Sequence, residues 1–334
     1  MAFSERLIAD WYRPRLTALT AALLPLSYLF RALVAIRREL YRMGVFRAAS
    51  LRAPVVVVGS IVVGGTGKTP LVRALAAALR EAGWHPGLVA RGYGGSNVSP
   101  RAVVSTDDPA IVGDESLLLA GDGFPVWIGR DRAAAARELL AARLDCDVIV
   151  ADDGLQHYAL ARDFEIAVID SARGVGNGRL LPAGPLRETS RRLEAVDALV
   201  HLATDDAPSA KPMTMRYEPL PWRNLVEAGA AADADAWRRG TVHAIAGIGD
   251  PARFFALLSR LGFEAVCHAF ADHHRYTRDE LRFPGATAVL MTEKDAVKCS
   301  RFADERFWYL PIRARIDFDL AALVARKLRG REAA

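Results

Sequence analysis

A glycine-rich loop between an apolar run and an alanine-rich segment constrains the fold of this chain most. The loop reads Gly-Gly-Thr-Gly-Lys-Thr at residues 64–69, after an apolar run at 54–58 and before a run rich in alanine and leucine at 70–80. A buried strand that turns through glycines into a helix directs backbone N–H groups and the positive helix end toward one anion. The order of strand, loop and helix therefore predicts a phosphate-binding loop, with a nucleoside triphosphate as ligand.

Within this loop, Lys68 can reach the β- and γ-phosphates and Thr69 can bind Mg²⁺. Val62 stands where the full consensus has glycine, so the motif is incomplete as a string. The alternative, a glycine-rich turn that binds no phosphate, gives a lysine and a threonine at the helix start no packing purpose. We therefore expect ATP at a loop made of Val62, Val63, Gly64, Gly65, Thr66, Gly67, Lys68 and Thr69.

A second apolar run, at 147–151, ends in Asp152, Asp153 and Gly154 and is similar to a Walker B strand. Carboxylates at the carboxyl end of a buried parallel strand lie at the sheet edge where ligands bind. An Asp-Asp-Gly sequence is also common in ordinary turns. Beside the loop at 64–69, the metal role is favoured, and we expect Thr69, Asp152 and Asp153 to hold Mg²⁺.

The composition indicates a globular protein of two domains. The chain has 334 residues, of which 51% are apolar and 25% charged, and its three cysteines are scattered without metal-ligand spacing. A chain of this length exceeds what one core usually serves. The formal charge is +5, but no basic patch is interleaved with aromatic residues, so we expect no nucleic-acid partner.

Strand and helix patterns alternate along the chain, as in a doubly wound α/β fold. We expect a P-loop NTPase-like, mostly parallel sheet at 45–203, with its last strand near 197–202, and a smaller α/β domain at 204–334 after a polar stretch at 203–212. A second strand and glycine turn, at 242–250, lacks a following lysine. It predicts either a second nucleotide site or, as we favour, a turn whose glycines serve geometry alone. The closing helix at 320–328 can pack on either domain.

The amino-terminal segment, 1–44, differs from the rest. Residues 16–30 are all apolar, small or hydroxylic, and arginines flank them. One helix continuing to Tyr41 is predicted, and its apolar part is shorter than a bilayer core. A helix lying in one leaflet, with its arginines at the lipid headgroups, fits better than a full span. The alternative is an ordinary core helix.

Several blocks of sequence together resemble the tetraacyldisaccharide 4′-kinases of lipid A biosynthesis. The blocks lie at 63–70, 91–94, 113–115, 152–157, 181–188, 272–274 and 292–295, and one departure is Ser60, where the family has asparagine. The resemblance implies transfer of the ATP γ-phosphate to the 4′-hydroxyl of tetraacyldisaccharide 1-phosphate. It also implies a place at the cytoplasmic face of the bacterial inner membrane, a membrane-surface partner and no required protein partner.

The resemblance further implies that Asp114 takes the acceptor proton with support from His273, and that Lys68 neutralises phosphate charge. Asp114 could instead cap the helix that follows it, and histidines 157, 273 and 274 could be structural. A rival function is an ATPase or GTPase switch that acts on a protein partner. Residues expected around the site or against the substrate are Arg91, Gln156, His157, Arg187 and Glu188.

Overall fold

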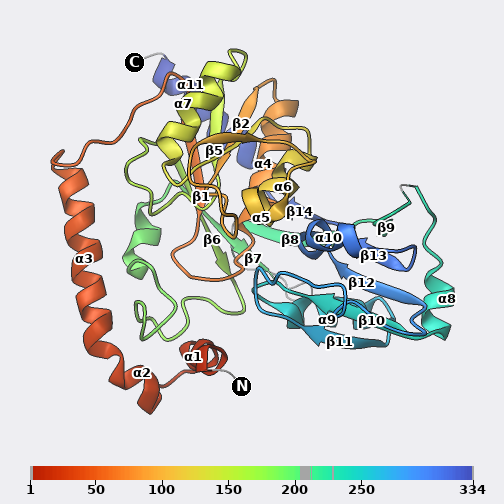
Figure 1. The fold of residues 1–334 in the computed structure, drawn as a ribbon. Helices are drawn as coiled ribbons and strands as arrows, with labels where there is room; N and C mark the ends of the chain where they lie inside the picture. The colour runs from red at the N-terminus through yellow and green to blue at the C-terminus, as the bar shows by residue number, and fades with distance from the viewer. Residues whose placement is uncertain (1–2, 204–210, 212, 228, 333–334) are drawn as a thin grey trace.

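The computed structural model describes residues 3–203, 211, 213–227 and 229–332, which form two sheets (Figure 1). The larger sheet has nine strands in the order β14-β8-β7-β6-β1-β5-β2-β4-β3. Neighbours pair in parallel except β3 with β4 and β14 with β8. This confirms the predicted mostly parallel sheet. Its strands are β1 (Val55–Gly59), β2 (Pro86–Ala90), β3 (Arg101–Val103), β4 (Val126–Ile128), β5 (Val148–Ala151), β6 (Phe164–Asp170), β7 (Ala198–Leu202), β8 (Thr214–Pro219) and β14 (Ile312–Ile316).

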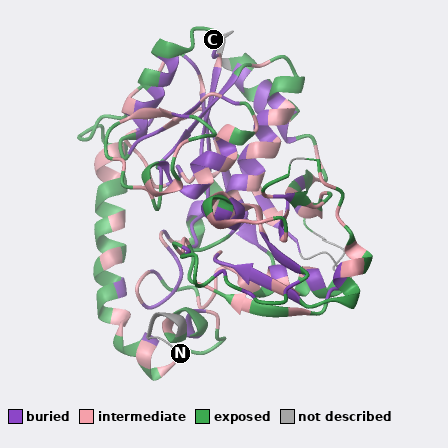
Figure 2. Ribbon diagram, turned by 45° about the vertical axis from the view of Figure 1, so that its right-hand side comes forward, coloured by how far each residue is buried: buried purple, intermediate pink, exposed green. Residues whose placement is uncertain are grey.

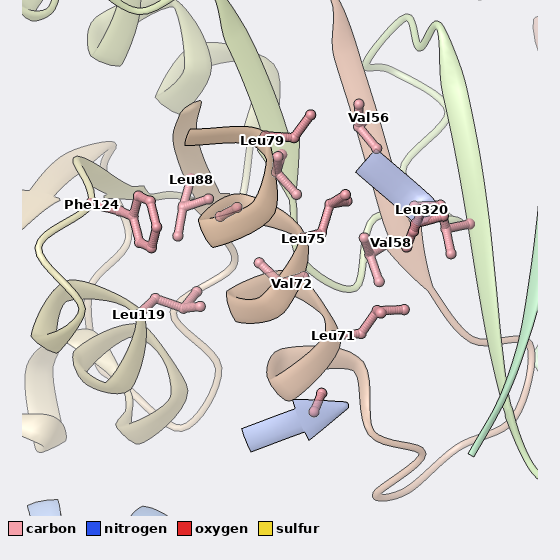
Figure 3. Close-up of a cluster of buried hydrophobic side chains, with 14 of the residues drawn as sticks. Val56, Val58, Leu71, Val72, Leu75, Leu79, Leu88, Leu119, Phe124 and Leu320 are labelled. Atoms are coloured by element: carbon pink, nitrogen blue, oxygen red, sulfur yellow. The ribbon is translucent and has the colours of Figure 1, made fainter. Parts of the chain in front are cut away.

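Helices cover both faces of the large sheet, because its central strands are apolar on both sides. Val56 and Val58 of β1 face a cluster built with α4 (Lys68–Glu81), α6 (Asp114–Gly121) and α11 (Leu320–Glu332), as Figure 3 shows. Val55 and Val57 alternate to the other face and pack with α7 (Arg132–Ala142). This period-two alternation into two buried faces is typical of a doubly wound sheet.

The smaller sheet has the order β11-β10-β12-β13-β9 and is parallel except for β9. Helix α9 packs on one face with a cluster that includes Phe254 and Leu258. The other face carries Tyr276 and Phe307 in a second cluster that includes residues of α10. The elements are β9 (Arg223–Asn224), α8 (Ala234–Arg239), β10 (Val242–Ala246), α9 (Pro251–Arg260), β11 (Ala265–Ala269), β12 (Ala288–Thr292), α10 (Glu293–Cys299) and β13 (Phe307–Leu310).

The boundary between the two units differs from the predicted one. Strand β8 pairs in parallel with β7, so β7 does not end the large sheet, and β14 returns to pair with β8. The apolar run at 308–312 is divided at Pro311 between β13 of one sheet and β14 of the other. Most of the predicted boundary at 203–212 lies outside the described residues. We call residues 45–219 with 312–332 the large lobe and 223–310 the small lobe.

Helix α11 packs on α4 and β6 and therefore belongs to the large lobe. This settles where the closing helix lies, which the sequence left open. The sequence could not settle it because the apolar residues of this helix would suit either core. The loop at 220–222 and the single residue between β13 and β14 are the described connections between the two sheets.

The amino-terminal segment forms three helices, and two of them cover the range 16–41 where one continuous helix was expected. They are α1 (Phe3–Trp11), α2 (Ala18–Ala22) and α3 (Leu24–Arg42). The break falls at Leu23, two residues before Pro25 in the first turn of α3, because proline lacks the N–H that would continue the preceding helix. Among the described helices, none is long and apolar enough to cross a membrane.

Helix α3 lies at the edge of the large lobe, away from both sheets (Figure 1), and most of its surface is exposed (Figure 2). Phe30 is half-buried against a small apolar cluster with Leu180 and Leu186. The alternative of an ordinary core helix is therefore wrong. Its large apolar side chains that are more than half exposed are Leu26, Tyr28, Leu29, Leu33 and Ile36.

Candidate active site

A cavity of about 890 Å³ lies between the two lobes and reaches α3. All of the predicted site residues line this cavity except Val62 and Asp114. Both of these are buried immediately behind its wall. The cavity is lined by Phe30 and Arg37 of α3, Gly65 and Lys68 of the phosphate loop, and His273 and Lys294 of the small lobe.

The phosphate loop leaves the first turn of α4 open. Gly67 is the N-cap of this helix, has a left-handed backbone with φ of 88°, and provides no side-chain cap. A Cβ at Gly67 would lie 2.9 Å from the Tyr217 hydroxyl, so both the backbone and the space require glycine. The first-turn N–H groups thus have no side-chain cap, and the anion site at this helix end stays a prediction.

Thr69 and Asp152 meet at the foot of the loop. The Thr69 hydroxyl donates to Asp152 Oδ2 at 3.0 Å, while the buried Asp152 Oδ1 has no hydrogen-bond partner among the described residues. Burial, followed by the nearby charges of Glu115 and Asp153, raises the pKa of Asp152 to about 7. A buried carboxylate oxygen without a partner is costly, and a cation would satisfy it. Thr69 and Asp152 thus fit the donor set that Mg²⁺ uses beside nucleotide phosphates.

Asp153 faces protein cations instead. Its carboxylate accepts from Arg187 Nη1 at 2.9 and 2.8 Å, and Lys68 Nζ lies 3.7 Å away. Burial opposes ionisation, but the charges of Lys68 and Arg187 prevail and lower the pKa of Asp153. The buried Arg132 also donates to its backbone carbonyl at 2.8 Å. The two adjacent carboxylates therefore differ, because one oxygen of Asp152 has no hydrogen-bond partner among the described residues, whereas cations hold Asp153.

Asp114 and His273 come from different lobes and form a direct pair. His273 Nδ1 lies 3.0 and 3.1 Å from the two carboxylate oxygens of Asp114, although 159 residues separate them. Burial would raise the pKa of Asp114, but the hydrogen bond from His273 and the charge of Lys294 lower it. Asp114 is not the N-cap of α6, since Gly113 holds that position, but Asp114 Oδ1 does accept from the first-turn Glu115 N–H at 2.9 Å. The pair is thus a carboxylate and an imidazole at the lobe interface.

The remaining predicted residues support the cavity wall. Glu188 is 2% exposed and accepts from Gln156 Nε2 at 2.8 Å and from the Tyr158 hydroxyl. Burial and the charge of Arg132 lower the pKa of His157 to about 4, so its ring is neutral at pH 7. Its buried Nε2 has no hydrogen-bond partner among the described residues. These groups hold the wall in shape, whereas Arg91 is exposed on the cavity surface.

Sequence reasoning gave no role to several charged residues at the site. Lys294 and Glu115 lie within the quoted blocks. Arg73 of α4 binds Asp122 within the large lobe and Glu293 across the lobe interface. The scarcity of lysine, with five in the chain, was the available signal for Lys294. His274 is structural, since its Nε2 pairs with Glu280 at 3.0 Å.

Comparisons with known proteins agree on one family. A family model described as tetraacyldisaccharide-1-P 4′-kinase, LpxK, matches residues 19–329. A tetraacyldisaccharide 4′-kinase of Methylobacillus flagellatus is 46% identical over 98% of this chain and 97% of its own length. A relative of the same name from Alkalilimnicola ehrlichii is 51% identical over 93% of each chain.

A solved structure agrees in fold. The crystal structure of the "apo" form of LpxK from Aquifex aeolicus in complex with ATP has a TM-score of 0.76 and 28% identity to this chain. The match covers 93% of this chain and 99% of the Aquifex aeolicus chain. With the family model and the relatives, the comparisons establish that this chain belongs to the tetraacyldisaccharide-1-P 4′-kinase family.

Proposed function

We propose that this protein transfers the γ-phosphate of ATP to the 4′-hydroxyl of a tetraacyldisaccharide 1-phosphate, which yields lipid IVA for lipid A biosynthesis. The observation that carries the proposal is the single cavity that joins the phosphate loop, the Asp114–His273 pair and the apolar side of α3. A nucleotide, a proton acceptor and a lipid-facing surface are the three elements that such a transfer needs. The names of the relatives and the ATP in the Aquifex aeolicus structure support the choice of substrates.

The phosphates bind at the open start of α4. Phosphoryl transfer depends on positioning and charge neutralisation more than on covalent chemistry. The loop N–H groups and Lys68 contact the β- and γ-phosphates, with Arg187 and Arg132 adding positive charge at the same wall. Lys68 exchanges its Asp153 contact, now 3.7 Å, for a phosphate oxygen. The loop thereby holds the γ-phosphate facing the acceptor.

Thr69 and Asp152 are the residues that would hold Mg²⁺, and Asp153 positions Lys68 and Arg187. This assignment follows from the unpartnered Asp152 Oδ1, in contrast to the two arginine hydrogen bonds on Asp153. The chemistry that Mg²⁺ supplies in such sites is neutralisation of phosphate charge. Among the described residues, no group of three histidine, cysteine or acidic side chains forms a complete metal cage. This suits an ion held by one carboxylate, one hydroxyl and the phosphates.

The Asp114–His273 pair receives the acceptor proton. The O–H bond of the 4′-hydroxyl breaks, its proton passes to the pair, and the oxygen forms a bond to the γ-phosphorus while the bond to the leaving ADP oxygen breaks. His273 lines the cavity and Asp114, 4% exposed, lies behind it. Each lobe supplies one member of the pair, so it exists only when the lobes are together.

Helix α3 places the enzyme on the membrane surface at the cytoplasmic side, where ATP is available. Leu29 and Leu33 are each 58% exposed on this helix, while Phe30 and Val34 line the cavity. Its arginines flank the apolar residues and suit anionic headgroups. Acyl chains can therefore stay against α3 while the sugar headgroup enters the cavity.

The membrane part is tested by vesicle sedimentation. Leu29→Ser with Leu33→Ser is expected to lower the fraction bound to anionic vesicles severalfold, because exposed apolar area is lost. Leu144→Ser is the matched control, since Leu144 is 80% exposed in the large lobe, after α7 and not on α3. Equal binding of both variants would refute the role of α3.

The transfer itself is tested with γ-labelled ATP, Mg²⁺ and detergent-dispersed tetraacyldisaccharide 1-phosphate. We expect label in the lipid product with the wild-type protein. ATP hydrolysis with an unlabelled lipid would instead favour a nucleotide switch that acts on a protein partner.

A further inference from the structure

Lys294, the second residue of α10, is surrounded by acceptors from both lobes. Its Nζ lies 3.0 Å from Glu115 Oε1, 3.1 Å from Asp272 Oδ1 and 3.4 Å from His273 Nε2. An ammonium group has three N–H donors, so these three acceptors use all of them. Burial opposes its charge, but Glu115 and Asp114 raise the pKa of Lys294 above its usual range. The group is a fixed cation rather than a mobile surface lysine.

The same ammonium group is one of two cations near Asp114, beside its imidazole partner. This carboxylate faces His273 from the loop after β11, Lys294 at 4.0 Å and Lys298 at 3.9 Å from α10. Lys298 is already paired with Asp295 at 2.8 Å. Lys294 is therefore the cation that both faces Asp114 and contacts its imidazole partner.

We propose that Lys294 is a positioning residue for phosphoryl transfer, which keeps His273 oriented on Asp114 and keeps the Asp114 carboxylate ready to take a proton. The inference rests on the proposed function. Its geometric basis is a chain in which Lys294 donates to His273 Nε2 and His273 Nδ1 donates to Asp114.

This chain fixes the tautomer of the imidazole. A nitrogen that accepts from an ammonium group carries no proton, so the hydrogen of His273 resides on Nδ1 and is directed at Asp114. Glu115 connects the same ammonium group to α6, which also carries Asp114. Lys294 thus links the contact between the lobes to the orientation of His273 on Asp114. The buried carboxylate needs this charge because burial alone favours its protonated form.

The test is the pH dependence of kcat/KM for Lys294→Met, which keeps length and removes charge. We expect the acid limb to move upward by about one pH unit, because the pKa of Asp114 rises once an opposite charge is lost. The value of kcat at pH 7.5 is expected to fall by about tenfold or more. Lys294→Arg should keep the acid limb near the wild-type position. ATP affinity, measured with a fluorescent nucleotide, should change by less than about threefold.

Lys327→Met is the matched control, because Lys327 also pairs with an aspartate, Asp197, but on the surface of α11. Lys327→Met should leave the pH profile of kcat/KM unchanged.

If the acid limb of this profile does not move in Lys294→Met, with or without a lower kcat, the proposal is overturned and Lys294 has a structural role. A large rise in KM for ATP without a moved limb would also overturn it and make Lys294 a nucleotide contact. Should the methionine variant fail to fold, Lys294→Gln carries the same test. An inactive wild-type protein would refute the proposed function itself, separately from Lys294.

Discussion

Two glycine turns of this molecule share the same strand–turn–helix order, but side chains of the protein occupy the N–H donors of only one of them. The turn at 64–69 joins β1 to α4, and no side chain caps the helix. The turn at 247–250 joins β10 to α9, and there Asp250 caps the helix while Gly247 N–H donates to both oxygens of Asp295 at 3.1 Å. The first turn keeps its donors for a ligand, whereas carboxylates of the chain itself occupy the second.

The two turns also touch, since a Cβ on Gly249 would lie only 2.6 Å from the Gly65 nitrogen. The second turn therefore packs directly against the phosphate loop. The comparison teaches that the strand–turn–helix geometry alone does not specify a nucleotide site. What matters is whether an acidic side chain of the protein has already taken the place of the phosphate.

The largest expected effect comes from the first turn. Lys68→Ala should lower kcat by about a thousandfold or more, because its ammonium group neutralises transferring phosphate charge. Thermal unfolding should be nearly unchanged, since its contacts with Gly64 O at 3.4 Å and Asp153 at 3.7 Å are long. Labelled transfer assays and calorimetry measure both, with Lys327→Ala as control. Near-normal kcat in the folded variant would mean that Lys68 does not make the first turn a nucleotide site.

The second turn should respond in stability instead. Asp295→Asn removes a fully buried carboxylate that binds Gly247 N–H, Lys298 and the Tyr276 hydroxyl. A loss of about 3 kcal/mol in the free energy of unfolding is expected, because Lys298 stays buried without its partner. Urea titration checks this. A gain of nucleotide binding by the second turn in this variant would show that Asp295 alone suppresses a second site.

The contact between the turns is tested by Gly249→Ala. The added methyl group has no room at 2.6 Å from backbone, so the lobes must shift apart. KM for ATP should rise by about tenfold, with a smaller change in unfolding temperature. Gly121→Ala is the control, since a Cβ at Gly121 meets nothing within 4 Å. Wild-type kinetics in Gly249→Ala would mean that the second turn does not shape the loop.

The smallest effect is expected for Asp250→Ala. It removes the cap of α9 and an ion pair with Arg173 of the large lobe at 3.1 Å. About 1 kcal/mol of stability should be lost, as for other N-caps. Asp250 lines the cavity, but affinity for ATP should change by less than about threefold, because its carboxylate caps α9 and pairs with Arg173. A larger change in nucleotide affinity, measured by titration, would argue against that role of Asp250.

The central strands were predictable from the sequence because long apolar runs identify strands buried on both faces. The runs at 54–58, 147–151 and 242–246 correspond to β1, β5 and β10. Strand β8 was missed because its residues are partly polar, and β14 because its run is continuous with β13 up to Pro311. Strand β14 is at the edge of the sheet and β8 lies next to it, and the pairing of both depends on tertiary contacts that local patterns do not contain.

The phosphate loop was likewise local and predictable, but the rest of the site was not. His273 lies 159 positions from Asp114 and Lys294 lies 179 from Glu115, so no spacing rule joins them. The resemblance supplied Asp114 and His273, while Lys294 emerged only from the contact of α10 with α6. The different roles of Asp152 and Asp153 could not be predicted, because they depend on the Arg187 contact with Asp153, which only the fold creates.

The most direct test of this account is the number of nucleotides that bind. Calorimetric titration of the wild-type protein with Mg²⁺ and a non-hydrolysable ATP analogue should give one site per chain, and Lys68→Ala should weaken that site strongly while Asp250→Ala leaves it intact. Two sites per chain, or full binding in Lys68→Ala that is lost in Asp250→Ala, would contradict the assignment of the nucleotide to the first turn.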